Sequence, residues 1–239
     1  MRLRILAFPA VAVVVALLAG CTQLPLGGPQ ATPTPTSNGV ENLEPDAILA
    51  EATRAVAEAE TVHVAGTIGE GLFGLTLDVT FEGQDLAGTV NILGVIANVI
   101  RLGDVVYLKA DTTLFEQILP PDQRDSISRL GNKWVRINLA WLTALVPIPL
   151  TADDLISVTD PLTKGDPTTV RGQPAITLTD ANGAVVHVAT TGEPYLLDIS
   201  LEGDRDLTFS RFNETVTIEA PPDEEIFDLL GALGLSSSS

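Results

Sequence analysis

The feature that most constrains this chain is a two-residue alternation of apolar and polar side chains, which starts near residue 62. Over 73–81 one face carries Phe73, Leu75, Leu77, Val79 and Phe81, while the opposite face carries Thr76, Asp78 and Thr80. Such alternation is typical of a strand with one buried and one solvated face. It recurs over 62–68, 85–93, 95–102 and 104–110, with glycine-containing turns between, and so predicts an antiparallel meander.

A helix is predicted before this meander and a less regular region after it. Over 45–60 one apolar stripe is formed by Ile48, Ala52, Ala55, Val56 and Ala59, and Pro45 suits the first helical turn. The centre predicts short helical pieces over 112–119, 122–130, 139–145 and 152–159, with a strand over 133–137. Strands are predicted again over 168–172, 175–179, 184–190, 195–202, 207–212 and 215–219, followed by a short helix in 223–239.

The N-terminus carries an export signal. Arg2 and Arg4 precede an apolar run that ends in small residues before Cys21, which is the only cysteine. This order is typical of a secretory signal peptide, and the run is shorter than the roughly 20 residues of a membrane span. The tetrapeptide Leu-Ala-Gly-Cys at 18–21 resembles a bacterial lipobox, which implies cleavage after residue 20 and lipidation of Cys21. The alternative is an ordinary signal peptide followed by an unmodified thiol, a liability in an exported protein.

These observations predict the domain organisation and the location. We expect a signal peptide at 1–20, then the lipidated Cys21 with a disordered Pro/Thr-rich tether over 21–42, and a single domain over 43–239 that ends in a frayed tail. The lipid on Cys21 would hold the chain at the outer, periplasmic face of the cytoplasmic membrane. The chain has 31 acidic and 13 basic residues, a net charge of −18. Because such a surface repels phosphate backbones, no nucleic-acid partner is expected.

No residue pattern points to catalysis, and we expect no enzyme activity, no cofactor and no metal. Residues 69–74 match G-x-G-x-x-G, but a strand pattern follows where a dinucleotide site needs a helix, so a hairpin turn is predicted. His63 and His187 each lie in a strand pattern without the partners of a zinc site or a nucleophile motif. The acidic clusters at 153–154, 204–206 and 223–225 lack the spacing of a calcium loop and suit helix starts and solvated surface.

Together, the lipobox, the tether and several stretches resemble the actinobacterial LppX/LprG-type lipoproteins, which share a LolA-like fold. The stretches are 48–68, the predicted hairpin 101–111, 132–137 and 172–203. The resemblance implies an α+β fold, in which a curled antiparallel half-barrel sheet of about 10–11 strands wraps around short helices, with an apolar cavity between them. It also implies a lipid-anchored protein that carries acylated lipids or glycolipids between membrane layers, with a membrane transporter as a candidate partner.

Two apolar stretches are the candidates for lining such a cavity, and ordinary core is the alternative for both. They lie in 91–102 and 137–150, and both are shorter than a membrane span. Burying acyl chains requires excess aliphatic surface, at about 0.8 kcal/mol per methylene. With the helical piece at 112–119 they supply the candidate cavity residues Leu93, Val95, Ile96, Val99, Ile100, Leu114, Ile118, Leu139, Trp141, Leu142, Leu145 and Ile148.

Basic residues gather near these stretches in an otherwise acidic chain. Such a zone could meet a phosphate or sugar head group, or it could consist of solvated pairs such as Asp122 or Asp125 with Arg129. The candidate head-group residues are Arg101, Lys109, Arg124, Arg129, Lys133 and Arg136. The alternative to a lipid carrier is an interaction or sensor lipoprotein of the envelope with a filled core.

Overall fold

The alternating stretches form one twelve-stranded sheet in a computed structural model. The structure describes residues 36–69, 74–119, 121, 127, 129–145, 151–203 and 205–229. The first meander comprises β1 (Val62–Ile68), β2 (Leu75–Glu82), β3 (Asp85–Ile92), β4 (Val95–Leu102), β5 (Val105–Ala110) and β6 (Trp134–Asn138). The second comprises β7 (Thr163–Val170), β8 (Gln173–Thr179), β9 (Val185–Ala189), β10 (Leu196–Leu201) and β11 (Arg205–Ser210), and β12 (Ile226–Asp228) follows.

The two meanders join side by side because β1 pairs with β11. The strand order is β12-β6-β5-β4-β3-β2-β1-β11-β10-β9-β8-β7, and all neighbours are antiparallel except the parallel pair β12 and β6. The expected α+β class and antiparallel meanders are confirmed. The strand number exceeds the expected 10–11, because the tail adds β12 at the edge of β6.

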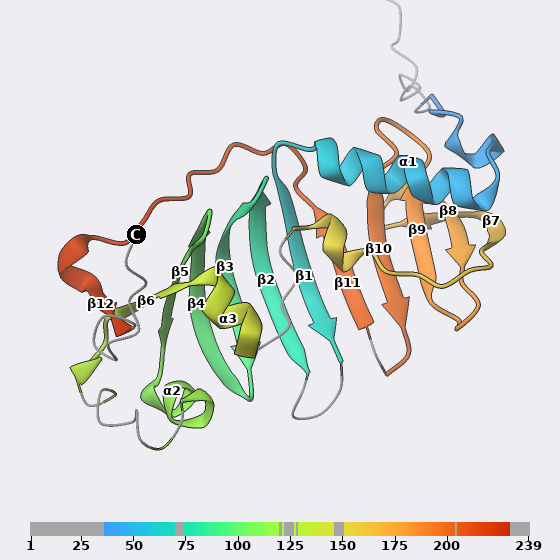
Figure 1. The fold of residues 1–239 in the computed structure, drawn as a ribbon. Coiled ribbons are helices and arrows are strands. Elements are labelled where there is room, and N and C mark those ends of the chain that lie inside the picture. The colour runs from blue at the N-terminus through green and yellow to red at the C-terminus, as the bar shows by residue number, and fades with distance from the viewer. Residues whose placement is uncertain are drawn as a thin grey trace, which may run out of the picture. The chain divides into compact units, whose positions relative to one another are not determined.

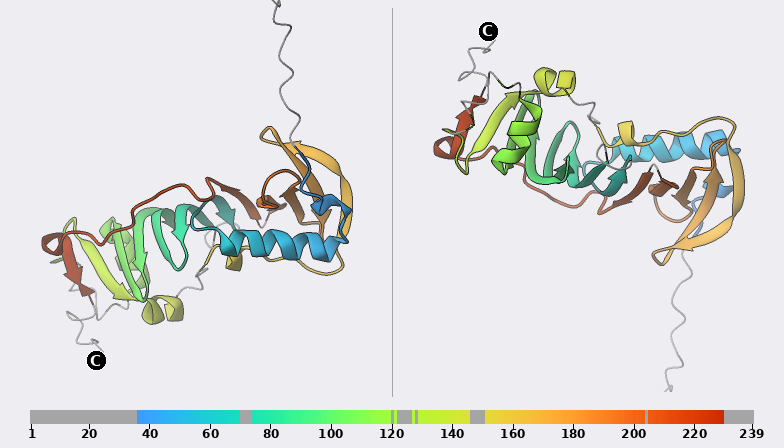
Figure 2. Two further views of the ribbon diagram at one scale, coloured as in Figure 1. Left: turned by 90° about the horizontal axis from the view of Figure 1, so that it is seen from above. Right: turned by 90° about the horizontal axis from the view of Figure 1, so that it is seen from below.

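The expected half-barrel curled around helices is not what forms. The sheet is not strongly curled, and β12 and β7 are its two open edges, at opposite ends of the strand order. The helices instead lie on one face, with α1 (Pro45–Glu58) over the second meander and α3 (Leu139–Leu145) over the first (Figures 1 and 2). The third helix, α2 (Thr112–Ile118), follows β5. Among the described residues, no helix combines the length and apolar character needed to cross a membrane.

The core lies between the sheet and α1, as the apolar stripe of that helix predicts. Ile48, Ala52, Ala55 and Val56 are buried, and Ala59 caps the helix. They pack towards the inward residues of the second meander, such as Leu196, Ile199 and Phe209, which are also buried. We call this helix-covered side of the sheet the inner face. Because this half of the inner face is closely packed, it supplies most of the apolar burial that stabilises the fold.

Two glycines sit on the inner face within strands and let neighbouring backbones approach closely. Gly66 in β1 has a φ of +143°, and a Cβ built there would lie 1.9 Å from the Asp206 carbonyl oxygen on β11. Gly88 in β3 has a φ of +155°, and its Cβ would lie 2.2 Å from the Asp78 carbonyl oxygen on β2. Side chains other than glycine would therefore force adjacent strands apart at both positions.

Some elements differ from the sequence-based expectation. Residues 215–219 are extended but pair with no strand, because the C-terminal segment runs along one end of the sheet from β11 to β12 (Figure 1). The predicted helix in 223–239 begins instead as a 3-10 turn, Asp223–Glu225, followed by β12. Residues 152–159 form only the 3-10 turn Asp153–Leu155. The helix predicted over 122–130 lies largely outside the described residues.

The folded unit starts within the expected tether. Ser37 bridges Thr191, and the Asn38 side chain donates to the Ala189 carbonyl oxygen at 3.0 Å. Val40, in a 3-10 turn over Val40–Asn42, is buried in the core. Residues 37–42 therefore belong to the fold, whereas Cys21 and the predicted signal peptide at 1–20 lie outside the described residues.

Asp180 holds the turn between β8 and β9 in a buried position. Its Oδ1 accepts hydrogen bonds from the backbone nitrogens of Asn182 (2.7 Å) and Ala184 (2.8 Å), and its Oδ2 accepts one from Thr159 (2.9 Å). Burial disfavours the charged carboxylate, but these backbone donors outweigh it and hold the pKa of Asp180 below its ordinary value of 3.8. The carboxylate thus ties the β8–β9 turn to the segment that precedes β7.

Replacing Asp180 with asparagine should lower the free energy of unfolding by about 1–3 kcal/mol at neutral pH, because an NH2 group would face a buried backbone N–H. The depressed pKa of Asp180 contributes stability above the unfolded-state pKa, and this contribution disappears as the pH falls through the folded-state pKa. The wild type should therefore lose stability below about pH 3.8, and Asp180→Asn should lose less over the same range. Urea unfolding of the wild type and of Asp180→Asn, at neutral pH and below about pH 3.8, measures these free energies. Equal losses of unfolding free energy in the two proteins on acidification would contradict the prediction.

Candidate functional site

An apolar pocket lies on the inner face of the first meander, where the longer helix α1 is replaced by the short α3. Its volume is about 80 Å³. The lining comes from β2, β3, β4, β5 and α3 and consists of Leu75, Leu77, Val79, Phe81, Leu86, Val90, Ile92, Val99, Leu108 and Leu142. Every described lining side chain is apolar, so the pocket offers burial to a hydrocarbon and no hydrogen bond.

The strand register shows which side chains face the pocket. Across the sheet, Val79, Gly88, Val99 and Leu108 are successive partners on β2, β3, β4 and β5. The two valines and Leu108 line the pocket, whereas Gly88 does not, because β2 lies so close that a Cβ at Gly88 would meet the Asp78 carbonyl oxygen at 2.2 Å. The pocket therefore lies above this row, between the inward side chains of the strands and Leu142 of α3.

The predicted cavity residues are spread over several environments. Val99 and Leu142 line the pocket, whereas Leu114 and Leu139 are buried elsewhere. Partly buried positions are taken by Leu93, Val95, Ile100 and Ile118. Ile96 lies on the outer face with 67% of its surface exposed. The side chains of Trp141 and Leu145, and all of Ile148, are outside the described residues.

The signal for the missed lining residues was present in the sequence. The alternation over 73–81 and 85–93 already places Leu75, Leu77, Val79 and Phe81 on one face, with Leu86, Val90 and Ile92 on one face of the next strand. Gly88 falls on the same face as these three residues of β3. The alternation therefore predicts the inward residues of these two strands, whereas the candidate cavity residues come from 91–102, 112–119 and 137–150.

The predicted head-group residues are not gathered at the pocket. Arg101 lies on the inner face, 5% exposed, and its Nε donates to the Gly103 carbonyl oxygen at 2.9 Å. Lys109 and Arg136 lie on the opposite, outer face. The Lys109 Nζ is 3.3 Å from Glu225 Oε2 and 5.7 Å from the Trp134 ring centroid. Arg129 and Lys133 are exposed before β6, and Arg124 lies outside the described residues.

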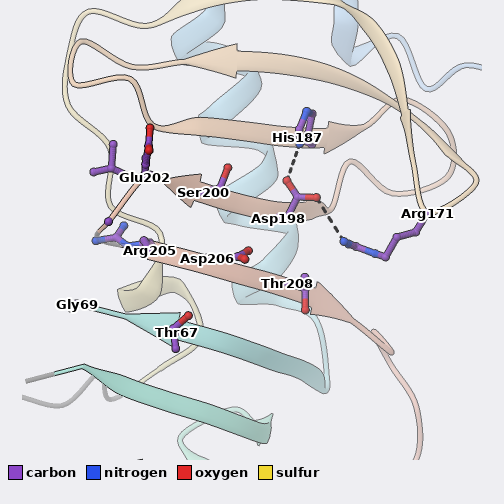
Figure 3. Close-up of a pocket in the computed structure, with 12 residues that line it drawn as sticks. Thr67, Gly69, Arg171, His187, Asp198, Ser200, Glu202, Arg205, Asp206 and Thr208 are labelled. Atoms are coloured by element: carbon purple, nitrogen blue, oxygen red, sulfur yellow. Dashed lines mark hydrogen bonds and ion pairs between the residues drawn. The ribbon is translucent and has the colours of Figure 1, made fainter. Parts of the chain in front are cut away.

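A larger, open hollow of about 790 Å³ lies on the outer face over β1, β9, β10 and β11 (Figure 3). Within it, His187 Nδ1 is 2.5 Å from Asp198 Oδ1, and an Arg171 nitrogen is 3.4 Å from Asp198 Oδ2. Arg171 also donates to the Leu197 carbonyl oxygen at 2.7 Å. This network ties the β7–β8 turn to β10, which is a structural role for the histidine.

The second histidine has a similar arrangement. On the outer face, His63 Nε2 is 2.7 Å from Asp78 Oδ1 on β2, and its Nδ1 is 3.2 Å from Ser210 Oγ on β11. Both histidines are thus hydrogen-bonded strand residues, as predicted. The described residues hold no group of three or more His, Cys, Asp or Glu side chains placed to bind a metal ion.

Comparison with known proteins bears on the fold. No protein-family model matches the sequence, and no curated protein matches it significantly. Among solved structures, the crystal structure of LprF from Mycobacterium bovis matches with a TM-score of 0.51. The match covers 79% of this chain and 99% of that chain, at 14% sequence identity. The chain has the LprF fold.

This confirms at the level of fold the resemblance noted in the sequence, because LprF is a lipoprotein of the LppX/LprG type. Within the LprF fold of this chain, the apolar pocket occupies the half of the inner face that α1 does not cover.

Proposed function

We propose that the protein binds and carries acylated lipids or glycolipids, and that the acyl chains occupy the apolar pocket under α3. The observation that supports this is the pocket itself, whose described lining is apolar throughout. A core without a ligand-binding role would gain stability from filling this space. The LprF fold supports the same proposal by analogy.

The ligand-free pocket must enlarge to accept a lipid. Its volume of about 80 Å³ is far below the roughly 300–1,000 Å³ of typical ligand pockets. The cover that has to move is α3, with seven residues, among whose described side chains Leu139 and Leu142 are buried. Displacing this short helix is a smaller change than displacing the fourteen-residue α1. The small volume also favours the alternative function, an interaction lipoprotein with a filled core, and the following experiment separates the two.

Leu142→Trp should block lipid uptake by more than tenfold while leaving the melting temperature nearly unchanged, because the larger ring fills existing space. The control is Ile96→Trp, which adds the same ring to the exposed face of β4. Uptake is measured from vesicles that carry a fluorescent diacyl phospholipid. In a filled core the same overpacking costs about 1–3 kcal/mol. Normal uptake together with a clear loss of stability in Leu142→Trp would therefore favour the filled core and overturn the proposal.

The proposed location and partners follow from the N-terminal sequence. Lipid on Cys21 would tether the folded unit by way of residues 22–36 at the outer face of the cytoplasmic membrane. A carrier at that place would receive its lipid from the membrane, and a membrane transporter is its candidate partner. We propose no catalytic reaction, because binding in an apolar pocket needs none.

A further inference from the structure

A second pocket adjoins the apolar pocket and shares one described residue with it. Its volume is about 190 Å³, and we call it the rim pocket. It lies where α1 ends, beside the β2–β3 turn and the 3-10 turn after residue 150. Its described lining is Val56, Ala57, Ala59, Val62, Phe81, Gly83, Gln84, Thr151, Ala152 and Asp153. Among the described lining residues of the two pockets, Phe81 is the one in common.

The register places the Phe81 side chain between the two spaces. Phe81 is paired with Val62 on β1, which lines the rim pocket, and with Leu86 on β3, which lines the apolar pocket. Only 2% of Phe81 is exposed, so its ring is buried on the inner face at this row. Among the described residues, Phe81 is thus the wall that the two pockets share.

The composition of the rim pocket suits one end of an amphiphile. Its interior is formed by apolar residues such as Val56, Val62 and Phe81, whereas Gln84, Thr151 and Asp153 supply polar groups. Gln84 is exposed in the β2–β3 turn, so these groups reach the solvent. The described lining carries an amide, a hydroxyl and a carboxylate, and it carries no cation. An uncharged, hydroxyl-bearing head group fits this surface better than a phosphate does.

We propose that Phe81 is a gate between the two pockets, and that its rotation joins them into one tunnel for an acyl chain. The chain would enter at the rim pocket, pass Phe81 and end under α3, with an uncharged polar head group at Gln84, Thr151 and Asp153. This inference rests on the proposed lipid-binding function and adds the entry route, the head-group class and the residue that determines chain length. The joined space, with the room vacated by the ring, approaches the roughly 300 Å³ at which ligand pockets begin.

The test measures dissociation constants for a series of saturated monoacylglycerols of increasing chain length, in a common Cys21→Ala background without lipid anchor. Each methylene buried should tighten binding about fourfold. In the protein with Phe81 unchanged, this gain in affinity should stop at the acyl-chain length that reaches Phe81. It should resume only weakly for longer chains, because opening the gate opposes binding. Phe81→Ala should abolish the break, so that the fourfold gain continues. A fatty acid of equal length, with its anionic head, should bind more weakly.

Phe209→Ala is the matched control, since Phe209 is equally buried on β11 but lines neither pocket. It should lower the melting temperature and leave the break in place. Phe81→Leu, a milder change, serves if Phe81→Ala does not fold. An unchanged break in a folded Phe81 variant would overturn the gate and leave lipid binding intact. Absence of monoacylglycerol binding in the wild-type sequence and in both variants would overturn the proposed function together with the gate.

Discussion

Gly66→Ala is expected to lower the free energy of unfolding by roughly 3–5 kcal/mol, since backbone strain and a steric clash act at the same atom. The φ of +143° is one that essentially only glycine adopts, and the new methyl group would lie 1.9 Å from the Asp206 carbonyl oxygen. Because that neighbour is backbone, the clash is relieved only if β1 and β11 separate. Chemical denaturation of the wild type and of Gly66→Ala measures this loss, with the same dependence of the unfolding free energy on denaturant concentration used for both.

The control for this effect is Gly83→Ala in the β2–β3 turn. Gly83 also has a positive φ, +57°, but nothing lies within 4 Å of the position of its Cβ. Only the cost of a left-handed residue should remain, about 1–2 kcal/mol. If Gly66→Ala were no more destabilising than Gly83→Ala, the close approach of β1 to β11 would be contradicted.

Cys21→Ala is expected to move the protein from the membrane fraction to the soluble fraction while leaving its thermal unfolding unchanged. Stable attachment takes two or more acyl chains, and a lipidated cysteine supplies them at this one residue. The intact mass of the wild-type protein should exceed that of the polypeptide 21–239 by the acyl groups. Thr22→Ala, one residue along, should keep the mass increase and the membrane location.

High salt distinguishes lipid attachment from electrostatic adhesion, because salt screens the interaction between exposed charges that lie farther apart than about 10 Å at 0.1 M, and this distance shrinks as the salt concentration rises. A Cys21→Ala protein that stays in the membrane fraction after a high-salt wash would show that another part of the chain holds it there. The lipobox interpretation would then be wrong.

The meanders could be predicted from the sequence because their period is local. In β2, each side chain is assigned to a face by its immediate neighbours, so Leu77, Val79 and Phe81 are found inward as expected. The same reasoning predicted α1 from the spacing of Ile48, Ala52 and Val56. In both cases burial confirms what alternation or helical spacing indicates.

Partners that are distant in sequence could not be predicted in this way. Residues 215–219 alternate like a strand, yet no described strand edge accepts them, whereas Ile226–Asp228 pairs with β6 from a segment with helix-like composition. The pocket as a whole could not be predicted either, because its lining combines residues of four strands with Leu142 of α3, and only pairing and packing bring these together. The basic residues are adjacent in sequence, but alternation sends Arg101 inward and Lys109 outward.

The pairing of β1 with β11 also bears on how the chain folds. Most other neighbours in the sheet are hairpins, which close small loops and form quickly, the exceptions being β5–β6 and β6–β12. Joining 62–68 to 205–210 requires a far longer loop, so we expect each meander to form by itself and the β1–β11 pairing to come late. Until then both strands present bare edges to other chains. The aggregation risk during folding is therefore concentrated at the place where Gly66 lets the two backbones meet.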